Sequence, residues 1–289
     1  MAAERSQHKS MKSQPIRFAL IVAAVAGVIS MQNAGTSASR FNRSAPRDAV
    51  SIQYDDPYAE FRDARYSNAG LMNERDEVKL GLQLHRAVTK KYNLTNAGLD
   101  RVERLGQRCA KVSLRPNLLY KFHVVQSREI NGFSLPGGHV YVTTGLLRIA
   151  NDNELASVLA HEVGHVVARH SLKTLKKTQE YDDIAKQIGN ITGVAGDAAR
   201  DLGVSLGQLL SSPILTAHSR DEEREADFLG VHFMAKAGFE PQGMIAMFQR
   251  LKRIEEQDSS LLGTLFSDHP DVDERISNTR YEIARMRRG

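Results

Sequence analysis

The chain has 289 residues, enough for one large domain or two small ones. Hydrophobic residues make up 41% of the sequence and charged residues 25%, and these values exclude a polytopic membrane protein, a collagen-like chain and a wholly disordered chain. The single cysteine, Cys109, excludes an intramolecular disulfide and a cysteine-based zinc cluster.

The net charge of +5 at pH 7 is concentrated at the N-terminus. Residues 1–40 hold five of the 39 basic residues but one of the 34 acidic residues, so the remainder of the chain is nearly neutral. The sequence has no basic stripe interleaved with aromatic residues, and we therefore expect no nucleic-acid partner.

The first 38 residues resemble an export signal. Residues 1–17 are polar and basic, and residues 18–31 form an uncharged run of fourteen residues. This run is shorter than the ~20 residues that span a bilayer, but it has the length of a signal-peptide core. Residues 36–38, Thr-Ser-Ala, resemble a cleavage site. We expect residues 1–38 to be a signal peptide and the chain to be exported to the periplasm; the alternative is an uncleaved signal anchor that associates with the membrane.

A linker and one domain are predicted to follow the signal. Residues 39–72 are rich in Arg, Asp, Ser and Ala without a clear period, whereas residues 73–289 carry periodic segments. In chain order we expect helices over 73–91 and 99–112, strands within 119–147, and helices from 153, over 221–237, over 241–256 and over 270–288. The segment 189–216 is rich in Gly, Ala and Ser and is predicted to be weakly helical or mobile.

The balance of helices and strands predicts an α+β fold that is mainly α, with a small sheet. Two candidate strands, LYKFHVV and HVYVTT, flank a turn at Pro136-Gly137-Gly138. Cys109 lies on the apolar stripe of the second helix with Val102 and Leu105, so we expect a buried structural thiol rather than a catalytic one.

The motif His161-Glu162-Val163-Gly164-His165 lies on the helix that begins near residue 153. Because an α-helix turns by about 100° per residue, His161 and His165 lie on one face, and both can reach a zinc ion at ~2.0–2.1 Å. Glu162 is placed beside them to accept a proton from water rather than to bind the metal. The same motif also occurs by chance on helices, where its histidines are ordinary surface or core residues.

A zinc site needs a third protein ligand, and His170 is poorly placed for it. This histidine follows His161 by nine residues, which turns it by roughly 180° about a continuing helix. We therefore expect His170 to face away from the metal and to be a structural or helix-end histidine.

The segment Ser219–Asp227 offers four acidic candidates at the start of the next helix. Each one is also explained as a solvated carboxylate that complements the helix dipole. Glu223 shares a stripe with Ala226 and Gly230, whose small size permits another helix to approach closely. Glu223 with Asp227 is the best pair on this basis, with Glu223 as a ligand and Asp227 holding the second ring nitrogen of a ligand histidine.

Three motifs in this order, HEVGH, SRDEEREAD and DHPDVDERI, resemble those of the HtpX/BepA/Oma-type gluzincin peptidases, metallopeptidase family forty-eight, which are relatives of the CAAX prenyl proteases. The match runs from about residue 74 to residue 280. The resemblance implies that residues 73–289 form a zincin-like metallopeptidase domain. It also implies one Zn²⁺ per chain, bound by His161, His165 and Glu223, with Glu162 as the general base.

The resemblance assigns roles to two further segments. The strand Val140–Thr144 is similar to the edge strand of the family, where a substrate backbone pairs with the sheet; the alternative is an ordinary sheet strand. His269 matches a His-Pro motif near the metal, where it stabilises the oxyanion of the transition state or occupies the metal in a resting state; the alternative is a capping histidine. Arg275 is expected to be structural or to orient that segment.

The function expected from these observations is zinc-dependent hydrolysis of peptide bonds in unfolded or misassembled cell-envelope proteins. A chaperone-like binding protein with a structural or latent zinc site is the alternative, because His269 as a fourth ligand would close the coordination sphere. A prenyl-protein protease is disfavoured, since the sequence lacks the group of membrane helices expected for its chamber. The substrate class rests on the resemblance, and the sequence does not indicate an oligomeric state.

Overall fold

The structure is a computed structural model that describes residues 56–62, 70–178, 180–190, 215–263, 265–269 and 271–288. The predicted signal segment and most of the Gly/Ala/Ser-rich segment lie outside these residues. All described residues belong to one unit, Tyr54–Gly289. None of the described helices combines the length and the hydropathy needed to cross a membrane.

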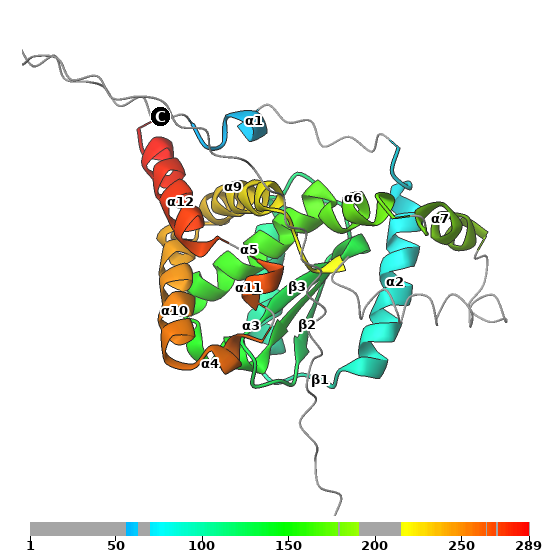
Figure 1. The fold of residues 1–289 in the computed structure, drawn as a ribbon, viewed down its shortest axis with the longest axis horizontal. Coiled ribbons are helices and arrows are strands. Elements are labelled where there is room, and N and C mark those ends of the chain that lie inside the picture. Colours follow the sequence, from blue (N-terminus) through cyan, green and yellow to red (C-terminus); the bar gives the residue numbers. More distant parts are fainter. Residues whose placement is uncertain are drawn as a thin grey trace, which may run out of the picture. The chain divides into compact units, whose positions relative to one another are not determined.

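Six helices expected from the sequence are present, with ends that differ by a few residues. They are α2 (Glu74–Lys91), α3 (Leu99–Lys111), α5 (Asp152–Ala168), α9 (Arg220–Lys236), α10 (Gln242–Asp258) and α12 (Val272–Met286). The shorter elements were not predicted: α1 (Ala59–Arg62), α4 (Thr144–Ile149), α6 (His170–Lys176), α7 (Tyr181–Asn190), α11 (Leu265–Asp268) and the 3₁₀ turns η1 (Pro136–Gly138) and η3 (Ser259–Leu262). The predicted fold class, α+β and mainly α with a small sheet, is confirmed (Figure 1).

The sheet contains β1 (Leu94–Thr95), β2 (Lys121–Val125), β3 (Gly132–Leu135) and β4 (His139–Thr143), in the order β1-β2-β4-β3. Strand β4 pairs with β2 in parallel and with β3 in an antiparallel hairpin closed by η1. The expectation that the strand at 140–144 is an edge strand is therefore wrong. The hairpin places β3 outside β4, so β3 is the edge strand of the described sheet on this side.

Helices cover both faces of this sheet (Figure 1). Alternate residues of a strand point to opposite faces. Val140 and Val142 of β4 accordingly join the core formed with α3 and α5, whereas Tyr141 joins a second core with Leu80 and Leu84 of α2. The sheet thus separates the α5 side of the molecule from the α2 side.

Residues 56–62 lie within the segment predicted to be a linker, but they pack against the domain. Tyr58 is fully buried, and its ring centroid lies 5.4 Å from that of Phe228 on α9. The ring of Phe61 also packs against Phe228, with centroids 6.3 Å apart. These two rings therefore belong to the core, while the boundaries of the predicted signal, linker and domain stay predictions.

Helix α5 begins with a capping box and ends at a residue in the left-handed conformation. The Asn151 side chain accepts a hydrogen bond from the backbone of Glu154, whose carboxylate accepts one from the backbone of Asn151. At the other end Arg169 has φ 57°, which breaks the helix before His170. Its guanidinium lies 3.2 Å from the buried carboxylate of Glu77 on α2, and this ion pair holds the turn.

Candidate metal and catalytic site

Helices α5 and α9 approach closely because small residues line their contact. A Cβ atom on Gly164 would lie 2.9 Å from the Ala226 carbonyl oxygen, and one on Gly230 would lie 3.2 Å from the backbone nitrogen of His161. The first distance is too short for a larger residue unless the backbone shifts, and the second is tighter than an ordinary van der Waals contact. The stripe of small residues predicted on α9 is therefore the surface on which α5 packs.

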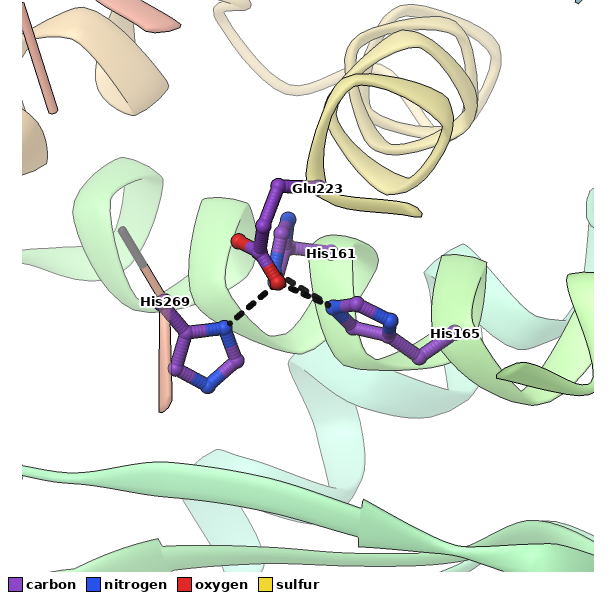
Figure 2. Close-up of side chains that lie close together, drawn as sticks. All are labelled: His161, His165, Glu223 and His269. Carbon is purple, nitrogen blue, oxygen red and sulfur yellow. Dashed lines mark hydrogen bonds and ion pairs between the residues drawn. The ribbon is translucent and has the colours of Figure 1, made fainter. Parts of the chain in front are cut away.

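This contact brings together four side chains whose nitrogen and oxygen atoms converge. Glu223 points from α9 to His161 and His165 of α5, and His269 approaches from the side (Figure 2). The Nε2 atoms of the two α5 histidines are 2.9 Å apart. Oxygens of Glu223 lie 3.4 Å from His161 Nε2, 3.2 Å from His165 Nε2 and 3.0 Å from His269 Nδ1. All four residues are buried.

Asp227 lies behind His161 on the side away from this group. Its Oδ1 is 2.9 Å from Nδ1 of His161, within hydrogen-bond distance. The carboxylate can only accept, so Nδ1 carries a proton, and Nε2 is the ring nitrogen directed at the converging group.

His165 is oriented by a chain of two further side chains. The Nε2 atom of His170 donates to Glu225 at 2.9 Å, which leaves its Nδ1 as the acceptor for Nδ1 of His165 at 2.7 Å. The expectation that His170 faces away is wrong, because α5 does not continue past Arg169, but its place directly after the end of this helix agrees with the expected helix-end histidine. His170 turns back toward His165, and no feature of the sequence at Arg169 signals this break.

Arg275 on α12 connects the carboxylates on α9. Its guanidinium donates to Asp227 at 2.7 and 2.8 Å, and its Nη1 lies 2.7 Å from Oε2 of Glu223. The second contact is an ion pair without the angular geometry of a hydrogen bond, so this Glu223 oxygen is buried without a hydrogen-bond donor. The sequence had suggested a structural or orienting role for Arg275 but not these partners.

Burial and the neighbouring charges shift the pKa values of Glu223, His161 and His165. Burial works against an ionised Glu223, but His269, Arg275 and His161 outweigh it and hold the pKa of this carboxyl well below its usual range. Burial also disfavours a charged His161, yet Glu223 raises the pKa of this histidine to about 9. For His165, burial and the neighbouring His218 lower the pKa well below the usual value.

His218 is another residue that sequence reasoning missed. Its ring stacks on that of His165, with centroids 3.8 Å apart, and burial together with the charge of His269 lowers its pKa to about 2. His218 is therefore a neutral side chain that packs beside the site.

Glu162 faces the edge of the sheet rather than the converging group. Its Oε2 accepts a hydrogen bond from the Ser134 hydroxyl of β3 at 2.9 Å, and its Oε1 lies 3.8 Å from His269 Nε2. The bond from Ser134 fixes one carboxylate oxygen and leaves the other directed towards His269.

A largely apolar pocket opens beside Glu162. Its apolar wall comes mainly from α10, while His161, Glu162 and His269 form its polar end. The apolar side chains that line it are Val158, Met244, Met247, Phe248, Leu251, Leu265 and Val272. A large apolar side chain placed there would lie next to the carboxylate of Glu162.

The converging group matches the donor set of a zinc site. Two imidazoles and one carboxylate are ligands that Zn²⁺ uses in catalytic sites. Donor atoms around one tetrahedral zinc ion lie about 3.3 Å apart, and the distances among His161, His165 and Glu223 run from 2.9 to 3.4 Å. The Glu223 oxygen that lacks a hydrogen-bond donor is one of the atoms that such an ion would bind.

A helix with two such histidines, facing a carboxylate on a second helix beside a small sheet, is typical of the zincin class of metallopeptidases. Residues 97–283 match the family model described as Peptidase family M48. The chain belongs to peptidase family M48. The predicted family and the predicted enzyme class, a zinc metalloendopeptidase, are confirmed at this level.

Three similar proteins illustrate the range of this family. The chain is 30% identical over 194 residues to metalloprotease YcaL of Escherichia coli, a match that spans 65% of this chain and 74% of that protein. It is 34% identical over 177 residues to the mitochondrial metalloendopeptidase OMA1 of Schizosaccharomyces pombe, spanning 61% and 50%. It is 26% identical over 190 residues to the beta-barrel assembly-enhancing protease of E. coli, spanning 64% and 39%. The chain thus spans half or less of the last two relatives.

Proposed function

We propose that the chain is an exported zinc endopeptidase that hydrolyses unfolded or misassembled cell-envelope proteins. His161, His165 and Glu223 bind one Zn²⁺ per chain, and Glu162 acts as the general base. The observation that carries this proposal is the convergence of four buried donor side chains next to a carboxylate that is not a member of the group.

The protein's own residues divide the work of hydrolysis. When bound, zinc supplies a Lewis acid that polarises the scissile carbonyl and lowers the pKa of water. Glu162 takes the proton from the attacking water and returns it to the leaving amine. Ser134 holds Glu162 in place, and Asp227 keeps His161 in the tautomer that leaves Nε2 free. His269 lies between Glu223, at 3.0 Å, and Glu162, at 3.8 Å.

Two features favour unfolded protein as the substrate. The edge strand β3 carries both Ser134 and Gly132, which lie beside Glu162 and the apolar pocket, so an extended peptide that pairs with β3 passes the proposed base. The apolar lining of the pocket suits an apolar side chain of the substrate, and folded proteins bury such side chains. Extended segments with exposed apolar residues are therefore the substrates that fit.

The cellular role rests on similarity and on the N-terminal sequence. All three relatives are named as proteases or endopeptidases, and one of them also for the enhancement of β-barrel assembly. Together with the predicted export signal, these names support a role in envelope protein quality control. N-terminal sequencing of the protein from fractionated cells tests whether residues 1–38 are removed.

The test compares the full chain with Glu162→Gln on an unfolded envelope protein, with mass spectrometry of the products. We expect Glu162→Gln to retain zinc and to lower the cleavage rate by about 10²–10⁴-fold, because glutamine cannot accept the proton. Glu103→Gln, an exposed change on α3, is the matched control and should cleave normally. Equal cleavage by Glu162→Gln, or loss of its zinc while it stays folded, would contradict the assignment.

The alternative function, a chaperone-like protein with a latent zinc site, is favoured by the position of His269 within the converging group. Four ligands would close the coordination sphere, as in structural zinc sites. In that case the zinc-loaded protein suppresses aggregation of the unfolded substrate, and neither it nor Glu162→Gln yields products.

A further inference from the structure

The short helix α1 and the turn before it dock on α9 through an aromatic cluster and one ion pair. The rings of Tyr58 and Phe61 both pack on Phe228, and their own centroids are 6.4 Å apart. At the surface, the carboxylate of Glu60 lies 3.1 Å from the guanidinium of Arg224. The segment is therefore fastened to the helix that supplies the proposed metal-binding carboxylate (Figure 1).

Tyr58 is buried where α9 and α12 meet. Its side chain is fully buried, and the charges of Asp227 on α9 and of Arg275 and Glu282 on α12 act on its hydroxyl. Thr279 on α12 is a further polar neighbour of this hydroxyl. None of the described residues meets the hydroxyl with regular hydrogen-bond geometry. The contribution of Tyr58 at this place is therefore its ring rather than a hydrogen bond.

The charged groups beside Tyr58 support a proposed metal ligand. Arg275 donates twice to Asp227, and Asp227 holds Nδ1 of His161. A buried ion pair keeps its strength only while water is excluded, because the attraction between two charges falls as the local dielectric constant rises. Tyr58 itself stays neutral, since burial and the charge of Asp227 raise its pKa. It therefore covers the ion pair with an uncharged ring.

We propose that residues 56–62 form a clasp that stabilises the metal site, with Tyr58 as a positioning residue for His161. Tyr58 acts through Arg275 and Asp227 and is not a member of the converging group of donor side chains. The inference rests on the proposed function, in which His161 binds zinc. It makes a segment that the sequence predicted to be a linker part of the support of the active site.

Docking of the clasp and binding of zinc are then coupled. If the docked clasp raises the affinity for zinc by some factor, bound zinc must favour the docked clasp by the same factor. We expect a factor of about ten, the lower end of the usual effect of losing a side chain that orients a metal ligand. Docking can be followed at the backbone N–H groups of Ala59 and Phe61, which are hydrogen-bonded within the clasp.

The first experiment measures zinc affinity by chelator competition in the full chain carrying Glu162→Gln, which prevents self-cleavage. Adding Tyr58→Ala should weaken zinc binding about tenfold, because water then reaches the ion pair. Tyr58→Phe keeps the ring and should leave the affinity nearly unchanged.

Tyr120→Ala is the matched control. Tyr120 is also buried, and its hydroxyl likewise has no hydrogen-bond partner among the described residues, but the charges that act on it are those of Arg115, Glu77 and Glu74. This change should lower the midpoint of chemical denaturation without changing the zinc affinity of the folded protein.

The second experiment needs no change at Tyr58 and decides the question if Tyr58→Ala folds poorly. In the Glu162→Gln protein, saturating zinc should slow hydrogen exchange at the amides of Ala59 and Phe61 about tenfold. The amides of β1, at the edge of the described sheet opposite β3, are the control and should exchange at the same rate with and without zinc.

Equal zinc affinity in the folded Tyr58→Ala and Tyr120→Ala proteins, or exchange at Ala59 and Phe61 that zinc does not slow, would overturn the clasp. Absence of zinc binding by the Glu162→Gln protein would overturn the proposed metal site and the role of the clasp with it. Zinc binding without cleavage by the native chain would overturn the proposed hydrolysis and leave the clasp intact.

Discussion

Arg275 and Asp227 form a two-point ion pair, in which Nε of the arginine donates to Oδ2 at 2.7 Å and Nη2 donates to Oδ1 at 2.8 Å. The same Oδ1 lies 2.9 Å from Nδ1 of His161. A side chain on α12 thus fixes the carboxylate that fixes a proposed zinc ligand. Because the arginine also neutralises Glu223 at 2.7 Å, it links the stability of the buried site to its metal affinity.

We expect Arg275→Gln to lower both quantities. Two buried carboxylates would lose their cation, and breaking a buried pair of this kind costs about 3–5 kcal/mol of unfolding free energy. Without Arg275, Asp227 holds His161 less firmly. Zinc affinity should therefore fall by about 10–100-fold, the usual effect of losing a side chain that orients a metal ligand. Chemical denaturation and competition with a chelator measure the two effects. Arg280→Gln, at an exposed position on the same helix, is the control, and equal losses in both variants would contradict the argument.

Three glutamates on α9 provide a graded test of the ligand assignment. Glu223→Ala should remove most of the zinc, since it deletes a proposed ligand. Glu222→Ala should leave zinc in place and cost about 0.3–1.5 kcal/mol of stability, because Glu222 serves in the capping box with Ser219.

Glu225→Ala should have an intermediate effect. From the sequence it is expected to leave the metal site unchanged, but its carboxylate accepts from His170, which in turn contacts His165. We now expect zinc affinity to fall by about tenfold, less than for Glu223→Ala. Glu225→Gln should restore part of it, because the amide oxygen can still accept from His170. An empty site in Glu225→Ala with a full site in Glu223→Ala would mean that the proposed ligand is the wrong glutamate.

The parts of the molecule that follow from local pattern were predictable. Residues close together in the sequence are enough to predict three such features. They are the apolar stripe of α3, the capping residues of α5 and the Gly238 that follows α9. The approach of α5 to α9 was also predictable, because Gly164 and Ala226 leave room for it.

The parts of the molecule that depend on residues far apart in the sequence could not be predicted. Strand β3 has four residues, too few for a periodic signal, and the order of strands depends on where the chain returns after β2. The left-handed turn at Arg169 is stabilised by Glu77, 92 positions earlier in the chain, so the direction of His170 could not be read locally. Arg275 reaches the site from the last helix, and no spacing rule connects it to Asp227.

Cys109 should be unreactive in the folded protein. It is fully buried, and burial raises the pKa of its thiol to about 12. At pH 8 about one thiol in 10⁴ would be the reactive thiolate even with access for a reagent. Labelling with iodoacetamide should therefore proceed only in denaturant, as followed by mass spectrometry. Since the folded pKa lies above the unfolded value of 9.0, the contribution to stability is present below pH 9 and is lost as the pH rises above it. Rapid labelling of the native chain at pH 8 would contradict this.

His269 lies between the proposed metal ligands and the proposed base. Its Nδ1 is 3.0 Å from Glu223 and its Nε2 is 3.8 Å from Glu162, so the two ring nitrogens face different partners. Burial disfavours its charge, but Glu223 outweighs burial and raises the pKa of His269 above its usual value. The position suits either a fourth metal ligand in a resting state or a donor to the oxyanion.

The two roles predict opposite signs for His269→Ala. As a resting ligand, His269 competes with the water that Glu162 activates, and its removal should raise basal cleavage and weaken zinc binding slightly. As an oxyanion donor, its removal should lower turnover by about 10²–10³-fold with little change in zinc content. We expect the first outcome, because the imidazole edge that contains Nδ1 already faces Glu223 at hydrogen-bond distance. Steady-state cleavage of an unfolded protein and chelator competition on the same samples distinguish them. Unchanged turnover together with unchanged zinc affinity would exclude both roles and leave His269 as a capping residue of its loop.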